Sequence, residues 1–135
     1  MERPTRRMPN LDGNEHIVKW GTATLGPEAK IKLHVFGMPT PILVQLDRPI
    51  ILGRGDNDGV TQVDVDLTPF QAVEAGVSRQ HATLELLRKT VMLTDLGSTN
   101  GTFINEQRVL PQQRRVVRDN DEIRLGKLII HIYFG

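Results

Sequence analysis

Residues 78–110, SRQHATLELLRKTVMLTDLGSTNGTFINEQRVL, contain the pattern that decides the fold class. Two runs rich in aliphatic and β-branched residues, HATLELLR and TVMLTDL, flank a short turn at Lys89, and TFINEQRVL turns at Asn105 and Glu106. Short runs of this kind, separated by turn residues, are typical of β-hairpins. A further hairpin is expected in EIRLGKLIIHIYF, with its turn near Gly126.

The segments before residue 78 continue this strand pattern. IKLHVFG places Ile31, Leu33 and Val35 on one side of a half-buried strand, and PILVQL and PIILGR each begin with a proline, which suits the start of a strand. Because many short strands follow one another at regular spacing, the sequence predicts an all-β sandwich or barrel.

One segment, TPFQAVEAG at residues 68–76, has the signals of a short helix. Thr68 takes the N-cap position, Pro69 the first helical position, and Gly76 is a stop signal. A helix here has about two turns at most, so we expect a short helical insertion near residues 68–76 within a loop.

Composition and charge exclude several classes of function. The 135 residues suffice for one domain with a sizeable core. A formal charge of +1 argues against a general nucleic-acid binder, and the absence of cysteine excludes disulfides, thiol catalysis and thiolate zinc sites. No segment has the features of a signal peptide or about 18 consecutive apolar residues, so we expect a cytoplasmic protein without membrane contact.

Residues 1–29 differ from the rest of the chain. They contain three prolines, several glycines and a basic cluster at Arg3, Arg6 and Arg7, without a sustained hydrophobic period. We expect an N-terminal extension at 1–29 that is partly flexible, with Trp20 available to attach its second half to the surface, and a folded domain at 30–135.

Three motifs interrupt the strand pattern with residues that a strand does not require. They are LGRG at 52–55, SRQH at 78–81 and LGSTNGT at 96–102. Each falls at a strand end or in a loop, where binding groups usually lie on a rigid β-scaffold.

The side chains of these motifs are suited to an anion. Arg54, between two glycines, presents a planar fork of donors that matches phosphate oxygens. Ser78 and Thr99 are hydroxyl donors, and the Asn100 amide can pair with both the N–H and the C=O of an extended peptide. A plain surface turn remains the alternative for each motif taken alone.

His81 allows two interpretations. A Ser78–His81 dyad would make the chain a hydrolase, but GxSxG does not surround the serine and the sequence indicates no third member. We favour a structural imidazole, placed either in an inward-facing position with the parity of Thr83 and Glu85 or where a loop folds over it, and bonded to loop backbone groups.

In their order, the three motifs resemble the forkhead-associated (FHA) domain family. The residues that match are Gly53-Arg54, Ser78-Arg79-Gln80-His81 and Thr99-Asn100-Gly101, and NDEIRLGKLIIHI is also similar. The resemblance covers residues 30–134. The link between Arg54 and Ser78 is longer than is common in the family.

This resemblance implies a fold and a function. It implies an FHA-type β-sandwich of about eleven strands that is not an enzyme and binds phosphothreonine in partner proteins, as an adaptor in Ser/Thr-kinase signalling. It requires no cofactor and no metal. The implied phosphopeptide-binding residues are Arg54, Ser78, Arg79, Thr99 and Asn100, and the implied supporting residues are Gly53, His81 and Gly101.

The roles carried over from the family divide between phosphate and peptide. Arg54 and Ser78 would contact the phosphate, with Arg79 alongside it and Thr99 adding a hydroxyl bond. Asn100 would hold the peptide backbone.

Two further hypotheses concern partners. The chain could instead be a scaffold that binds proteins independently of phosphate, through a sheet face. Its own N-terminal tail, with Thr5, Thr22 and Thr24, could become phosphorylated and occupy the site.

Asp56, Asp58, Asp64 and Asp66 lie in the long link, and without a helix-loop-helix context they are expected to be solvated loop carboxylates rather than calcium ligands.

Overall fold

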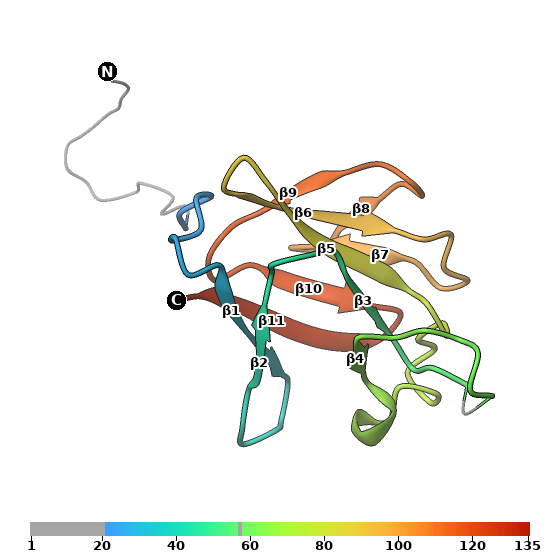
Figure 1. The fold of residues 1–135 in the computed structure, drawn as a ribbon. Helices are drawn as coiled ribbons and strands as arrows, with labels where there is room; N and C mark the ends of the chain where they lie inside the picture. Colours follow the sequence, from blue (N-terminus) through green and yellow to red (C-terminus); the bar gives the residue numbers. More distant parts are fainter. Residues whose placement is uncertain (1–20, 57) are drawn as a thin grey trace.

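The structure, a computed structural model, describes residues 21–56 and 58–135, which form two β-sheets packed face to face (Figure 1). The predicted all-β sandwich of about eleven strands is confirmed. Its elements are β1 Lys30–Val35, β2 Ile42–Gln45, β3 Ile50–Gly53, β4 Val65–Asp66, the 3₁₀-helix η1 Thr68–Phe70, β5 Ala82–Leu87, β6 Thr90–Asp95, β7 Thr102–Ile104, β8 Gln107–Val109, β9 Arg115–Val117, β10 Glu122–Leu125 and β11 Leu128–Phe134.

The strand order brings distant loops to one end of the sandwich. The six-stranded sheet has the order β2-β1-β11-β10-β7-β8, and the five-stranded sheet has the order β4-β3-β5-β6-β9. Leu52, near the end of β3, lies opposite Ala82 at the start of β5, which lies opposite Asp95 at the end of β6. In the other sheet Thr102, at the start of β7, pairs with Leu125 at the end of β10. The loops at 54–64, 67–81 and 96–101 and the β10–β11 turn therefore share one end.

The core lies between the sheets and consists of aliphatic side chains. Alternation along β1 turns Ile31, Leu33 and Val35 inward, as the sequence predicts. Leu52 from the facing sheet and Ile130 from β11 are fully buried against them. The fully buried hydrophobic side chains among the described residues are Val, Ile, Leu and Ala, because the chain contains few aromatic residues.

The three predicted hairpin turns are present, and positive φ values define their backbone conformation. Arg88 and Lys89 have φ of 52° and 68°, and Asn105 and Glu106 have φ of 49° and 70°. Two successive positive φ values are the signature of the type I′ turn, whose twist matches that of the flanking strands. Gly126, between β10 and β11, has φ of 62°.

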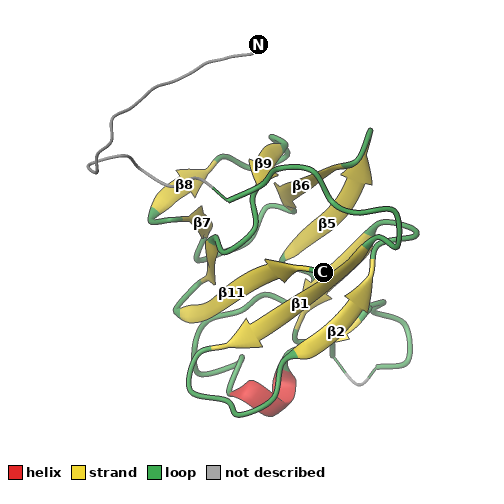
Figure 2. Cartoon of the chain, turned by 90° about the vertical axis from the view of Figure 1, so that its left-hand side faces the viewer, coloured by secondary structure: helices red, strands yellow, loops and turns green. Residues whose placement is uncertain are grey.

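The helical insertion is shorter than predicted. Only Thr68–Phe70 is helical, as a 3₁₀-helix followed by turns (red in Figure 2). The N-cap is Leu67 rather than Thr68, and Gln71, with φ of 61°, ends the helix before Gly76 is reached. In the described part of the chain no helix is long and apolar enough to cross a membrane.

Residues 21–29 contact the domain at the end opposite to the converging loops. Leu25 is buried and its N–H donates to the Lys89 carbonyl at 2.8 Å, while Thr24 forms a bridge with Thr90 beside the β5–β6 turn (Figure 1). A phosphate on Thr24 could therefore reach the loop end only after this pairing had broken. The predicted surface contact of Trp20 and the tail residue Thr5 lie outside the described residues, and the domain boundary at residue 30 stays a prediction.

Candidate binding site at the loop end of the sandwich

The three sequence motifs meet at one end of the molecule. The Arg54 N–H donates to the Ser78 carbonyl at 3.2 Å, and the Thr99 N–H donates to the Ser78 hydroxyl oxygen at 3.2 Å. Gly101 joins the same assembly through its carbonyl, which accepts the N–H of Gly126 at 2.9 Å. Of the eight residues predicted for the site, Gly53 is the last residue of β3, and the other seven belong to loops that are hydrogen-bonded to one another.

The Arg54 guanidinium is held by backbone carbonyls rather than by a carboxylate. Its Nε donates to the Val77 carbonyl at 3.0 Å and one terminal nitrogen lies 3.5 Å from the Gly55 carbonyl. The side chain is half-buried and forms no ion pair with a described residue. A fixed, uncompensated guanidinium of this kind is prepared for an anion.

Gly53 allows the loops that carry Arg54 and Ser78 to approach each other closely. A Cβ built on Gly53 would lie 2.1 Å from the Arg79 carbonyl oxygen and 3.0 Å from that of Ser78. Any larger residue would therefore push the two loops apart.

Two hydroxyl groups lie beside this arginine. Ser78 is half-buried, and its Oγ accepts the Thr99 N–H but has no acceptor for its own proton among the described residues. The exposed Thr99 hydroxyl has no hydrogen-bond partner in the described part of the chain. Both hydroxyls are therefore available as donors to a bound acceptor.

The Asn100 amide is fixed on one side only. Its Nδ2 donates to the Gly76 carbonyl at 2.9 Å, while Oδ1 has no donor among the residues that the structure describes. Gly76 has φ of +80°, and a Cβ there would lie 2.5 Å from Asn100 Nδ2. The sequence marked Gly76 only as a helix stop, whereas its position in the structure is determined by contact with Asn100.

His81 connects two of the loops from a buried position. Nδ1 accepts the Ser78 N–H at 3.0 Å, and Nε2 lies 2.9 Å from the Gly101 carbonyl oxygen. Since the carbonyl can only accept, Nε2 carries the proton and the imidazole is neutral. Ala82 and Leu84 are the buried positions of β5, so the expected inward-facing parity with Thr83 and Glu85 is wrong. His81 is buried because the loops fold over it, which is the second predicted alternative. The unprotonated nitrogen, Nδ1, accepts the Ser78 backbone N–H, so it is not available as the base of a Ser78–His81 catalytic dyad.

We expect protonation of His81 to destabilise the protein. Burial lowers the pKa of His81 below its ordinary value of 6.5, and the hydrogen bond to Gly101 and the charge of Asp95 only partly oppose this. The unfolded chain therefore binds the proton more readily, so stability is fully present above pH 6.5 and falls as the pH falls toward the lower folded-state pKa. Between the unfolded-state and folded-state pKa values of His81, the free energy of unfolding decreases by up to about 1.4 kcal/mol per pH unit.

NMR titration of the imidazole groups measures this directly. His81 should remain the neutral Nε2–H tautomer through pH 6.5. Urea unfolding midpoints should be measured from pH 7.5 to 5.0. We expect them to decrease over the pH range in which His81 becomes protonated in the unfolded chain. A His81 resonance that titrates at or above 6.5 would contradict the prediction.

Asp95 organises the loop that carries Thr99 and Asn100. Its buried carboxylate accepts the N–H groups of Gly97 at 2.9 Å and Ser98 at 3.1 Å, and the hydroxyls of Ser98 and Thr102 at 2.6 Å each. Burial raises the pKa of Asp95, but the bonds from Ser98 and Thr102 outweigh it and lower the pKa below the ordinary range. Sequence reasoning missed Asp95, although an Asp two residues before a Gly is a turn signal.

Arg79 is exposed and already paired with a carboxylate. One of its terminal nitrogens lies 2.8 Å from Asp56 in the β3–β4 loop, and this hydrogen bond and charge raise the pKa of Arg79. An anion in the site would therefore compete with Asp56 for Arg79.

The other three aspartates of the link also have partners: Asp58 accepts from Thr61, Asp64 pairs with Arg48, and Asp66 accepts from Thr68.

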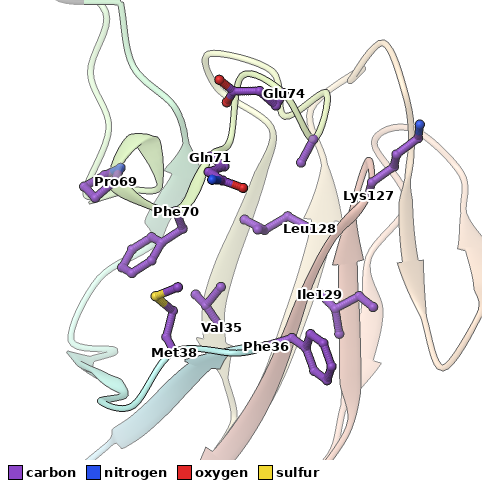
Figure 3. A pocket seen from close by; sticks show the side chains of 11 residues that line it. Val35, Phe36, Met38, Pro69, Phe70, Gln71, Glu74, Lys127, Leu128 and Ile129 are labelled. Carbon is purple, nitrogen blue, oxygen red and sulfur yellow. The ribbon is translucent and has the colours of Figure 1, made fainter.

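A pocket of ≈ 430 Å³ with both apolar and polar walls adjoins the loops (Figure 3). Phe70 and Met38 lie on one side of it and Leu128 and Ile129 on the other. It connects to the site through the 75–76 segment, because the Lys127 N–H donates to the Ala75 carbonyl at 2.8 Å. This pocket could not be predicted from the sequence, since its walls come from segments far apart in the chain.

Comparison with known proteins agrees with the geometry. The FHA domain family model matches residues 50–126. FraH of Nostoc sp. is 44% identical over 64 residues, covering 47% of this chain and 22% of FraH. The FHA domain-containing protein FhaA of Mycobacterium tuberculosis is 36% identical over 76 residues, covering 56% of this chain and 12% of FhaA. The chain thus spans less than a quarter of either relative.

A solved structure supports the same assignment. A domain from a study of phosphothreonine-dependent FHA domain interactions has a TM-score of 0.62 and 28% identity, covering 78% of this chain and 97% of that chain. The family model covers more than half of the 135 residues and includes all three motifs. On this combined evidence, the chain belongs to the FHA domain family.

Proposed function

We propose that the chain binds phosphothreonine in partner proteins through its loop end, and that it is an adaptor in Ser/Thr-kinase signalling rather than an enzyme. One observation carries this proposal: the uncompensated Arg54 guanidinium and the available hydroxyls of Ser78 and Thr99 belong to loops that are bonded to one another. A phosphate carries about −1.5 to −2 charges and strong acceptor oxygens, which these donors match without a metal.

The peptide around the phosphate is held at Asn100. Nδ2 already bonds Gly76, so Oδ1 is oriented and accepts an N–H of the partner's main chain. Gly53, His81 and Gly101 act indirectly, because they set the positions of Arg54, Ser78 and Asn100. Arg79 contributes after release from Asp56. The proposed site of action is the cytoplasm, where a kinase supplies the phosphorylated partner.

Fluorescence anisotropy with a degenerate phosphothreonine peptide library tests this function. The best-binding sequence is then synthesised with Thr, phosphothreonine, phosphoserine or Glu at the central position. We expect the phosphothreonine form to bind at least about 100-fold more tightly than the Thr form, since the charge-assisted bonds exist only with phosphate. Glu should not replace the modification, because a carboxylate has less charge and fewer acceptors.

The same measurement separates this function from that of a phosphate-independent scaffold. A scaffold that uses a sheet face would bind a partner protein equally well before and after phosphatase treatment. Equal binding of the Thr and phosphothreonine peptides, or no binding of any library member, would contradict the proposal.

A further inference from the structure

Two arginines flank an aromatic ring on the outer face of the six-stranded sheet. The Arg124 and Arg108 guanidinium carbons lie 3.9 Å and 5.8 Å from the centroid of the Phe103 ring. The strand register explains this, because Phe103 of β7 is opposite Arg108 of β8 and Arg124 of β10. We call Arg108, Phe103 and Arg124 the Arg–Phe–Arg cluster.

The cluster borders the loop that carries Thr99 and Asn100. A Cβ built on Gly101 would lie 3.1 Å from the Phe103 ring and 3.2 Å from Arg108 Nε. Arg124 donates to the Gly126 carbonyl at 2.7 Å, and the N–H of Gly126 donates to the Gly101 carbonyl. Gly101, which follows Asn100 directly in the chain, thus connects the cluster to the loop that carries Asn100.

The positive charge of this cluster is not neutralised within the described protein. Neither Arg108 nor Arg124 forms an ion pair with a described residue, whereas Arg79, in the β4–β5 loop, is paired with Asp56. Glu122, an acid on the same strand as Arg124, lies 3.9 Å from His131 instead. An anionic group near the site therefore meets less competition at Arg108 than at Arg79.

We propose that the Arg–Phe–Arg cluster is an accessory subsite that binds the carboxylate of an Asp or Glu close to the phosphothreonine of the partner. The proposal rests on the function proposed above. A peptide advances about 3.3–3.6 Å per residue, so a chain held at Asn100 reaches Arg108 within a few residues. Arg124 stacks on Phe103 and donates to Gly126, whereas the exposed Arg108, within cation–π range of the same ring, keeps its planar fork available for a carboxylate.

A matched peptide scan tests the subsite. In a phosphothreonine peptide with neutral flanks, each flanking position is substituted in turn with Glu and with Gln, and the two dissociation constants are compared. We expect at least one position at which Glu binds about three- to fivefold more tightly than Gln, the range of a partly exposed ion pair. In Arg108→Gln this preference should disappear, while the affinity for the Gln peptides stays within about twofold.

Arg88→Gln provides the control. It removes the same charge from an exposed position in the β5–β6 turn, at the opposite end of the sandwich, and the Glu preference should persist in this variant. If no position prefers Glu over Gln, or if the preference survives in Arg108→Gln, the subsite is refuted. Failure of the neutral-flanked phosphothreonine peptide to bind the parent protein would instead refute the proposed function itself.

Discussion

Replacing Arg54 with alanine is expected to weaken binding of a phosphothreonine peptide by about 30-fold or more, because truncating one partner of a fixed charge pair costs about 2–5 kcal/mol. Arg54 is held at Nε by the Val77 carbonyl, so it is oriented before the ligand arrives. The substitution also leaves the anion facing only hydroxyls and Arg79, which is paired with Asp56. Anisotropy titration of the phosphothreonine peptide measures the loss.

Two further variants show whether the loss arises at the site. Arg88→Ala removes the same charge at the far end of the sandwich and should change the affinity by less than about twofold, because charges beyond a Debye length are screened. Arg54→Lys keeps the charge but lacks the planar fork, so its affinity should fall between those of the parent and Arg54→Ala. If Arg54→Ala is folded and binds as tightly as the parent, the phosphate lies elsewhere.

The β-hairpins could be predicted because their information is local. The alternation of Ile31, Leu33 and Val35 assigns the buried face of β1 without knowledge of its neighbours. Residues that tolerate positive φ mark the turns at Asn105 and Gly126. At residues 68–76 the capping signals predict a longer helix than the structure contains. The helix ends at Phe70 because Gln71 adopts a left-handed conformation, which those signals do not indicate.

The motifs indicate the side chains of the candidate site, but they do not indicate the groups that hold these side chains. Arg54 and Asn100 are fixed by the carbonyls of Val77 and Gly76, and a carbonyl leaves no mark on the sequence because every residue has one. The pairing of Arg79 with Asp56 depends on how two loops approach each other across 23 positions of the chain. These contacts follow from tertiary structure, which composition and spacing do not specify.

Replacing Asp95 with alanine is expected to cost about 3–5 kcal/mol of folding stability and to abolish most phosphopeptide affinity. Four donors from Gly97, Ser98 and Thr102 converge on this carboxylate, which is 1% exposed. Removal leaves these donors without a charged acceptor, and stranding buried polar groups is among the most destabilising changes known. Urea unfolding measures the stability, and anisotropy with the phosphothreonine peptide measures the affinity.

The loss of affinity should exceed what unfolding alone explains, because Asp95 fixes the loop that carries Thr99 and Asn100. Asp95→Asn keeps the size and one acceptor oxygen, so it should remain folded and still bind more weakly than the parent. Asp47→Ala is the control, since Asp47 is exposed and has no hydrogen-bond or ion-pair partner among the described residues. If Asp95→Asn loses stability but binds the peptide with unchanged affinity, the loop does not depend on this carboxylate for its binding geometry. Thr99 and Asn100 would then have to be positioned by their contacts with Ser78 and Gly76 alone.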